Sequence, residues 1–317
     1  MIEFLIKSAG ILALFLMFSY GLSLAAHMHW FFSLLSQFKI QFFFGAVLLL
    51  PILLIGKSYP AAAIMVLIGV SAFIEIYNAS PIIEKENKAE SEYFTVMQYN
   101  KLYTNKSYDR VTDFVLQQEI DVLIMQEVEH EDSPPLANAL AQNMPHSIPD
   151  DIYRPDFVSI FSKHPIKNLT VQKLCETPCT THGVRFDMQI EDTDITVYTI
   201  HTKTPIGKND YIQHSKELDI IAQWIKSDAR ETVILAGDFN TTPFTPAFKK
   251  MKATAQLDNT RFSIIEQGTW PAWGILPIFK IPIDHIMHKG DIRLINKHKG
   301  PAMGSDHHSL IATYAIE

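Results

Sequence analysis

Three long apolar runs without a charged residue lie in the first 80 residues of this 317-residue chain, at 8–26, 40–56 and 58–74. An uncharged apolar run of about 17–25 residues, folded as a helix, matches the hydrocarbon thickness of a bilayer. Pro51 interrupts the second run, which is therefore a weaker candidate than the first. The sequence predicts a membrane anchor over 1–80 with about three transmembrane helices, and the rest of the chain must fold beside a membrane.

The N-terminus also allows a different interpretation. Residues 1–25 could be a signal peptide, since Ser23-Leu24-Ala25 resembles a small-residue cleavage site. The two apolar runs directly downstream favour a retained anchor, and the aromatic segment 30–32 between the first two runs suits a membrane–water interface. With three spans and the N-terminus inside, we expect the remaining chain outside the cytoplasm. The flanking lysines do not strengthen this orientation, because they are divided between the two sides.

A polar, charged segment separates the apolar runs from the remainder, and we expect a linker over 81–92 and one domain over 93–317. Apolar patterns in that domain alternate between short strand-like runs and helical spacing. The expected strands are 93–99, 121–125, 193–200, 232–236 and 309–315, and the expected helices are 108–118 and 210–225. Strands mixed with helices over this length indicate a layered α/β domain with two sheets inside and helices outside.

The domain is acidic, because from residue 81 onward it contains 24 Lys and Arg against 32 Asp and Glu. Such a domain gains little from counterion release on nucleic acid. Nucleic acid is not thereby excluded as a substrate, since a bound cation inverts the local field of a carboxylate cluster. The two cysteines, Cys175 and Cys179, would fit a disulfide in an exported domain, but their spacing alone leaves that open. They are a poor zinc signal.

Polar residues follow several of the expected strands. Asn100 ends the first strand, Glu127 follows the second, and His201 ends the strand at 193–200. Taken singly, these are compatible with a turn-forming Asn, a solvated Glu and a strand-end His bonded to a loop. Taken together, side chains from different strand ends can converge on one edge of the domain, where carboxylate and amide oxygens suit a hard divalent cation.

The run ILAGDFNTTP at 234–243 is more specific. Gly237 permits a tight exit from the strand, and Asp238 and Asn240 point the same way if the segment stays extended. The pair offers a carboxylate that can orient or deprotonate water and an amide that can donate to a phosphoryl oxygen. The competing interpretation is an ordinary Asp/Asn turn after a strand.

Asp284 lies within the apolar run IPIDHIM, where an unpaired carboxylate would be costly. His307 is a reasonable partner, and such a pair raises the pKa of the histidine and fixes its tautomer. Asp306 and His307 are adjacent, so a bend is needed to bring both into one site. We expect His285 and His288 to face away from it.

This ordered set of motifs resembles the endonuclease/exonuclease/phosphatase superfamily, which has the DNase I-like fold. FSKHPI at 161–166 resembles the superfamily's Ser-Arg-x-Pro-Ile turn, and GTWP at 268–271 is similar to bacterial membrane-anchored members. The resemblance covers roughly 93–316. It implies an α/β fold, a four-layer α/β sandwich preceded by transmembrane helices, with the two sheets meeting at a metal-bearing cleft.

The resemblance also implies roles for single residues and a Mg²⁺ cofactor, with Mn²⁺ as a possible substitute. The implied metal residues are Glu127 as principal ligand, Asn100 near the metal or phosphate, and Asp306 assisting. The implied catalytic residues are Asp238 for the attacking water, Asn240 for phosphoryl oxygens, His307 oriented by Asp284, and His201 for the phosphate or leaving oxygen. Family members often carry an Arg in the following helix, but here that helix offers only His214 and Lys216.

The resulting expectation is a membrane-anchored, Mg²⁺-dependent phosphoesterase, more specifically a phosphodiesterase, acting by metal-assisted in-line attack of water. Its expected partners are the lipid bilayer and a phosphoester substrate, either a phospholipid head group or nucleic acid, with no protein partner. We expect it in a bacterial inner membrane with the catalytic domain outside the cytoplasm.

Two alternatives remain open. One is a nuclease acting on DNA or RNA. The other is a non-catalytic binding domain, which should have lost one or more of Glu127, Asp238, Asn240 and His307, and none is missing. A transport role for the helices is disfavoured, because their apolar interiors contain no ionisable residue.

Overall fold

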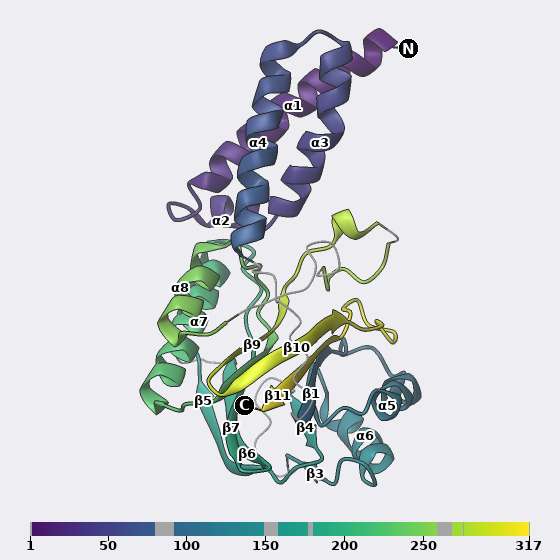
Figure 1. The fold of residues 1–317 in the computed structure, drawn as a ribbon, viewed down its shortest axis with the longest axis vertical. Coiled ribbons are helices and arrows are strands. Elements are labelled where there is room, and N and C mark those ends of the chain that lie inside the picture. Colours follow the sequence, from purple (N-terminus) through teal and green to yellow (C-terminus); the bar gives the residue numbers. More distant parts are fainter. Residues whose placement is uncertain are drawn as a thin grey trace.

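The computed structural model describes residues 2–79, 92–148, 158–176, 180–258, 268–274 and 276–316. Figure 1 shows a bundle of helices standing on one end of an α/β domain. The expected linker at 81–92 falls, except for its last residue, outside the described residues. Cys175 is disulfide-bonded, and the other cysteine of the sequence, Cys179, lies outside the described residues.

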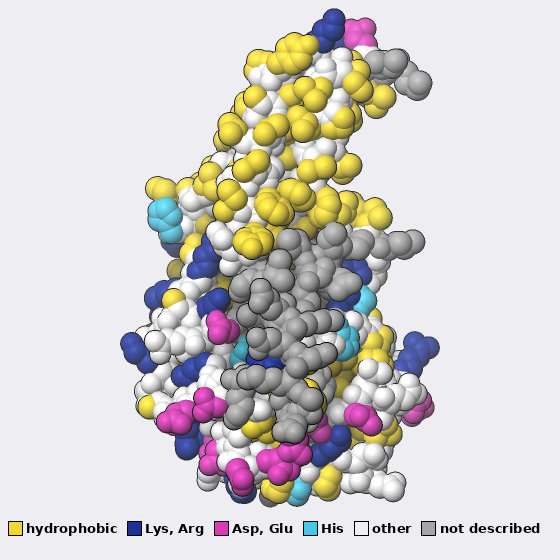
Figure 2. All heavy atoms as spheres, in the orientation of Figure 1, with side chains coloured by type: hydrophobic (Ala, Val, Ile, Leu, Met, Phe, Trp, Pro, Cys, Tyr) yellow, Lys and Arg dark blue, Asp and Glu magenta, His cyan; other side chains and the backbone are white. Residues whose placement is uncertain are grey.

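Each of the three apolar runs forms a helix. The bundle consists of α1 (Ile2–Leu24), α2 (Trp30–Ser36), α3 (Lys39–Ile55) and α4 (Tyr59–Asn78). By length and composition α1 and α4 could each cross a membrane, and α3 could form a third span together with α2, from which it is bent by 62°. Apolar side chains cover the bundle surface, in contrast to the charged surface of the domain (Figure 2). The membrane crossing itself stays a prediction.

One buried ammonium group ties three helices of the bundle together. Lys39 of α3 is 1% exposed, and its Nζ lies 2.8 Å from Glu75 Oε1 of α4 and donates to Ser23 Oγ of α1 at 3.0 Å. The same nitrogen lies 4.5 Å from the centroid of the Tyr20 ring, a cation–π contact. Lys39 therefore acts inside the bundle, although its place just before the second apolar run is that of a flanking charge.

The domain contains two mixed sheets. The first has the strand order β10-β11-β1-β2-β4-β3 and the second β5-β6-β7-β8-β9. The first sheet is built from β1 (Tyr93–Asn100), β2 (Val122–Gln126), β3 (His146–Ser147), β4 (Ser159–Ser162), β10 (Ile292–Lys299) and β11 (Leu310–Ile316). The second is built from β5 (Lys167–Lys173), β6 (His182–Ile190), β7 (Thr193–His201), β8 (Val233–Asp238) and β9 (Asp284–Lys289).

The sheets pack face to face and helices cover their outer faces, which gives the expected four-layer sandwich. Side chains such as Val96, Ile124 and Phe186 fill the space between the sheets. The outer face of the first sheet packs on α5 (Tyr108–Gln117) and α6 (Ser133–Leu140), and that of the second on α7 (Lys208–Asp228) and α8 (Pro246–Ala255). Because both faces of the central strands are covered, β2 is buried at every residue.

Two parallel strand pairs determine where polar side chains meet. β1 runs parallel to β2 and β7 parallel to β8, so each pair ends at the same edge of its sheet. In the register, Asn100 lies beside Gln126, and Asp238 lies between His201 on one side and Asp284 on the other. The strand ends that the sequence marked with polar residues are therefore neighbours in the fold.

A buried histidine makes the fold sensitive to acid. His214 of α7 is 2% exposed, and its Nε2 lies 3.0 Å from the carbonyl oxygen of Phe239. Burial lowers the pKa of His214 to about 4. In the unfolded chain the pKa of a histidine is about 6.5, so below that pH the unfolded state binds the extra proton. Stability is therefore lost as pH falls from about 6.5 towards 4.

We expect the variant His214→Gln, whose amide can still donate to that carbonyl, to lose less stability on acidification. Between pH 7 and pH 4.5 the difference should be about 2–3 kcal/mol. Thermal unfolding of the purified full chain at both pH values, followed by circular dichroism, measures it. Equal losses in the two proteins would show that His214 does not determine the acid response.

Candidate functional site

The amide of Asn100 joins two carboxylates from different parts of the fold. Its Nδ2 donates to Glu127 Oε1 at 2.9 Å and to Asp238 Oδ2 at 3.1 Å. The backbone N–H of Leu102 donates to Asn100 Oδ1 at 3.0 Å, which fixes the orientation of the amide. Asn100 thus presents its nitrogen to the two carboxylates, and its oxygen is held by the backbone.

The backbone is strained where these side chains are positioned. Glu127, Asn240 and Leu102 have φ values of 58°, 47° and 63°, a left-handed conformation that residues other than glycine rarely adopt. Tyr103 N donates to Glu127 Oε2 at 2.9 Å and holds that side chain. Gly237 is required just before Asp238, because a Cβ there would lie 2.0 Å from the carbonyl oxygen of Ile200. Such conformations are typical of functional sites.

His201 and Asn240 flank Asp238. His201 Nε2 lies 3.6 Å from Asp238 Oδ2 and 3.9 Å from Glu127 Oε1. The backbone N–H of Asn240 donates to Asp238 Oδ1 at 2.8 Å, and its side-chain nitrogen donates to the carbonyl oxygen of Thr202 at 2.9 Å. Asp238 Oδ1 is therefore held by the backbone, and Oδ2 is the oxygen on the side of His201.

Asp284 and His307 form a hydrogen-bonded pair. His307 Nδ1 lies 2.9 Å from Asp284 Oδ2, and the Nε2 on the other side of the ring lies 3.8 Å from Asp238 Oδ2. Burial alone would lower the pKa of His307, but the carboxylates of Asp284 and Asp238 outweigh it and raise that pKa to about 10. Burial and the nearby Asp284 raise the pKa of Asp238 above its usual value.

The turn before β11 supplies the bend that adjacent Asp306 and His307 require. Ser305 Oγ donates to the carbonyl oxygen of Asn100 at 2.7 Å and accepts from the backbone N–H of His307 at 3.0 Å. The carboxylate of Asp306 accepts from the indole N–H of Trp270 at 3.0 Å. His308 points elsewhere, with its Nε2 2.9 Å from Lys280 Nζ.

The expected site residues gather at one cavity of about 440 Å³. Six of them line it directly: Glu127, His201, Asp238, Asn240, Asp306 and His307. Asn100 and Asp284 lie behind this lining, bonded to Glu127, Asp238 and His307 as described above. His285 and His288 lie elsewhere, His285 with its Nε2 2.8 Å from the carbonyl oxygen of Thr241 and His288 against the ring of Tyr314.

Several supporting residues were missed in the sequence. Gln98 is fully buried, and its side-chain nitrogen donates to Asp284 Oδ1 at 2.9 Å and to Gln126 Oε1 at 2.8 Å. Lys101, 1% exposed, lies 2.8 Å from the buried Asp132 and donates to the carbonyl oxygen of Asn105 at 3.0 Å, which fixes the loop after β1. Gln98 could have been identified in the sequence as an amide within an apolar strand, because a buried polar group without a hydrogen-bond partner is costly there.

The lining also includes residues from the helical bundle, which no pattern in the sequence predicts. Leu34, Gln37 and Phe38, at the end of α2 and the start of α3, form part of the cavity wall. Apolar side chains of the domain, among them Ile206, Ile281 and Ile283, line the cavity too. The cavity therefore contains both carboxylates and an apolar wall.

The carboxylates suit a divalent cation. Glu127 and Asp238 both approach the amide nitrogen of Asn100, and within the described ranges no Lys or Arg forms an ion pair with either. Asp238, Asp284 and His307 could also bring one ligand atom each within 4.8 Å of one another. Two such carboxylates lose their mutual repulsion when a cation lies between them, and Mg²⁺ and Mn²⁺ prefer oxygen ligands.

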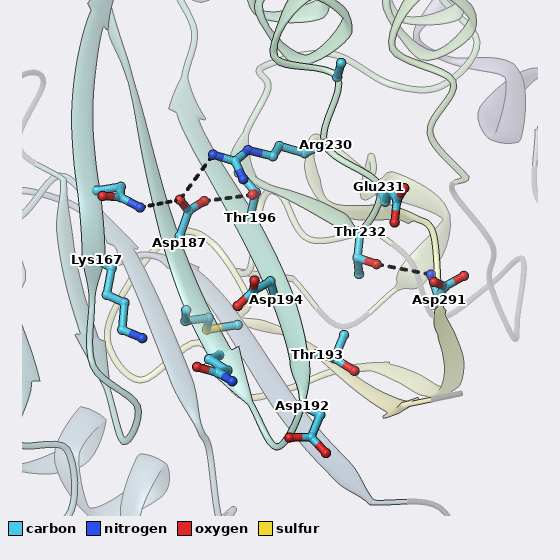
Figure 3. Close-up of a pocket in the computed structure, with 14 residues that line it drawn as sticks. Lys167, Asp187, Asp192, Thr193, Asp194, Thr196, Arg230, Glu231, Thr232 and Asp291 are labelled. Atoms are coloured by element: carbon cyan, nitrogen blue, oxygen red, sulfur yellow. Dashed lines mark hydrogen bonds and ion pairs between the residues drawn. The ribbon is translucent and has the colours of Figure 1, made fainter.

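A larger cavity of about 740 Å³ lies at the opposite end of the second sheet and is less suited to catalysis (Figure 3). Its carboxylate Asp187 already accepts from Thr196 Oγ1 at 2.8 Å and lies 3.6 Å from Arg230. None of the described residues that line it is a histidine. The charge of Asp187 is already compensated by neighbouring cations and a hydroxyl, whereas Glu127 and Asp238 have no Lys or Arg partner among the described residues.

Comparison with known proteins agrees with this geometry. The model of the Endonuclease/Exonuclease/phosphatase family matches residues 93–307. No curated protein matches the chain significantly. A structure of an endonuclease/exonuclease/phosphatase from Bacteroides vulgatus has a TM-score of 0.60 and 18% identity, covering 71% of this chain and 100% of its own.

Two further structures are similar at the same level. A variant of beta toxin from Staphylococcus aureus with bound magnesium ions has a TM-score of 0.55 at 16% identity, covering 70% of this chain and 99% of its own. The catalytic domain of human Nocturnin with a bound sulfate anion has a TM-score of 0.57 at 15% identity, covering 72% and 98%. At such identities the likeness shows the fold.

We expect Glu127→Gln to weaken binding of Mn²⁺ to the purified full chain by about tenfold or more, because removing one anionic oxygen removes a ligand charge. Electron paramagnetic resonance of free Mn²⁺ during a titration measures the dissociation constant without any substrate. Glu131→Gln is the matched control, since Glu131 is exposed and pairs with Lys106. Equal affinities of the two variants would remove Glu127 from the metal site.

Proposed function

The chain belongs to the endonuclease/exonuclease/phosphatase family, and from that premise we propose that it is a membrane-anchored, Mg²⁺-dependent phosphodiesterase. Members of this family are in general metal-dependent hydrolases of phosphoester bonds. The observation that carries the proposal is the group of three side chains around Asp238 Oδ2: the Asn100 amide at 3.1 Å, His201 Nε2 at 3.6 Å and His307 Nε2 at 3.8 Å.

Glu127 would hold the cation, with Asp306 and Asn100 beside it. When bound, the cation neutralises charge that develops on the phosphoryl and leaving oxygens. Glu127, Asp238 and the two histidines line one cavity, in which the phosphoryl group would lie. The anionic ligands and the cationic His307 have the charges that this group and its metal require.

Asp238 is suited to accept a proton from the attacking water. Its raised pKa makes the carboxylate a stronger base than a solvated one. Because the backbone of Asn240 occupies Oδ1, the proton of the water would pass to Oδ2. The water oxygen then forms the new bond to phosphorus on the side opposite the ester oxygen that leaves.

His307 and His201 have separate tasks in this proposal. His307 is held by Asp284 with its Nε2 on the side of Asp238, so a protonated ring can donate to a phosphoryl oxygen as negative charge accumulates there. His201 is partly exposed at the cavity wall, and its Nε2 is the donor available to the leaving oxygen. Asn240, held through Thr202, would bind another phosphoryl oxygen.

A nuclease is the alternative within the same family. A nucleic acid backbone needs several cationic contacts for tight binding. None of the described residues that line the cavity is a Lys or an Arg. The cavity therefore favours a diester with a single phosphate over a polyanion.

We expect His307→Gln to lower kcat for bis-p-nitrophenyl phosphate by about a hundredfold or more, because it removes the cationic donor beside the phosphoryl group. His308→Gln is the matched control one residue away and should keep kcat within about threefold. Steady-state kinetics of the full chain with Mg²⁺ measures both. A His307→Gln enzyme with near-normal kcat would contradict the mechanism.

Chelation gives an independent test. EDTA should abolish hydrolysis of the same diester, and Mg²⁺ or Mn²⁺ should restore it, because the carboxylates alone cannot neutralise the developing charge. Initial rates before and after the metal is returned measure the effect. Full activity in excess chelator would exclude the metal role.

The orientation can be tested by reporter fusions. The proposed location of the domain outside the cytoplasm is supported by the odd number of proposed spans and by the disulfide at Cys175, which fits an oxidising compartment. Alkaline phosphatase fused after residue 317 should be active in a bacterial host, and a fluorescent protein that matures only in the cytoplasm should stay dark there. Fusions after Lys57, between α3 and α4, should behave in the opposite way. The reverse pattern would overturn the orientation.

A further inference from the structure

We propose that the apolar wall of the catalytic cavity binds the hydrocarbon part of an amphiphilic phosphoester, and that the bend between α2 and α3 forms part of that wall. The inference rests on the proposed phosphodiesterase and names its substrate class. It assigns the helical bundle a direct part in substrate binding, in addition to holding the domain at a membrane.

The bend is fixed to the catalytic domain by hydrogen bonds. The backbone N–H of Thr242 donates to Gln37 Oε1 at 2.8 Å. The side-chain nitrogen of Gln41 donates to the carbonyl oxygens of Ile278 at 2.8 Å and Lys280 at 3.1 Å. These contacts hold the bend against the two loops that follow β8 and precede β9. Leu34 and Phe38 therefore have a defined position at the cavity.

Apolar packing and charge strengthen the same junction. Phe244 of the domain is 2% exposed and packs against Ile40 of α3 and Ile76 of α4. Lys249 of α8 lies 3.7 Å from Glu75 of α4, the carboxylate that also pairs with Lys39. Bundle and domain meet at the foot of the bundle, where α2 lies beside the domain in Figure 1.

The cavity lining has a polar part and an apolar part, and one ligand can contact both. One part of its lining is polar and carries Glu127, Asp238 and His307, and another part is formed by Leu34, Phe38, Pro205, Ile206, Trp270, Ile281 and Ile283. A phosphate with one ester arm that is hydrocarbon matches both parts. A nucleotide matches only the first, because its second arm is polar and charged.

An exposed apolar rim connects the cavity to the bundle. Ile206, Trp273 and Phe279 are 64%, 72% and 67% exposed, more than any other large apolar side chain described beyond residue 91, and Leu276 is 54% exposed. Three of them lie in the loop whose Ile278 and Lys280 carbonyls bind Gln41 of α3. Exposed apolar side chains beside helices that can cross a bilayer are accounted for by contact with its apolar interface. An amphiphile can then pass from the bilayer to the cavity without exposing its chain to water.

The test uses ethyl, butyl and hexyl esters of p-nitrophenyl phosphate, which share one leaving group and differ only in the hydrocarbon arm. The full chain is placed in phosphatidylcholine nanodiscs with Mg²⁺, and kcat/KM is measured for each ester. Wild type should gain about tenfold or more from ethyl to hexyl, because each buried methylene adds to binding.

Two variants locate the chain-length effect. Leu34→Ser in the bend and Ile206→Ser in the domain should each reduce the hexyl-to-ethyl ratio of kcat/KM by at least about threefold. Leu116→Ser, an apolar residue of comparable size that is 40% exposed on α5, is the matched control and should keep the wild-type ratio. Because all proteins share one type of nanodisc, partition of the esters into lipid cancels in the comparison.

The outcomes separate this inference from the proposed function. Hydrolysis of all three esters at equal kcat/KM would contradict binding of the hydrocarbon arm by the apolar wall. An unchanged hexyl-to-ethyl ratio in both cavity variants would contradict it too. Neither result would contradict the proposed phosphodiesterase activity. No Mg²⁺-dependent hydrolysis of any ester would instead remove the proposed function. A short single-stranded oligonucleotide is included as a competing substrate, and a higher kcat/KM for it than for the hexyl ester would also overturn the inference.

Discussion

One amide group determines how the two sheets meet at the site. Asn100 ends a strand of the first sheet, whereas Asp238 ends a strand of the second, and the Asn100 nitrogen bonds to Asp238 and to Glu127. Two carboxylates cannot approach this closely without a donor or a cation between them. The amide supplies the donor, and the loop that holds it is anchored by the buried Lys101–Asp132 pair. This contact fixes Glu127 and Asp238 relative to each other.

The buried Asp284 behind the cavity lining and its partner His307 are also stabilised by specific contacts. Asp284 is buried, and it is tolerable there because His307, Gln98 and Thr269 all contact its carboxyl group or backbone. The attraction between Asp284 and His307 holds the pKa of Asp284 below its ordinary value despite burial, and keeps the imidazole charged. A neutral replacement of either partner would leave the other buried without compensation. The position of the His307 ring and the stability of the buried Asp284–His307 pair are thus coupled.

The sequence predicted the layers, five of the eleven strands described and the convergence of the eight expected site residues, because strand ends, apolar runs and the GDFN turn are local signals. Asn100, Glu127 and Asp238 were identifiable as strand-end polar residues, but the amide's orientation depends on a backbone N–H that no pattern indicates. The left-handed conformations at Glu127 and Asn240 were equally invisible, since neither residue type requires them. Contacts between segments that are distant in the chain determine these features, and no local sequence pattern reveals such contacts.

The contact of the helical bundle with the cavity was the feature least predictable from the sequence. Two glutamines nevertheless indicate it. Gln37 and Gln41 lie beside or within apolar helices, where an amide without a partner is costly. Both amides bond to backbone groups of the α/β domain. In an anchor that only crosses a membrane, apolar side chains at these two positions would serve better. Two glutamines four residues apart at the foot of the bundle therefore indicate a specific docking surface, and the cavity wall formed by Leu34 and Phe38 follows from that docking.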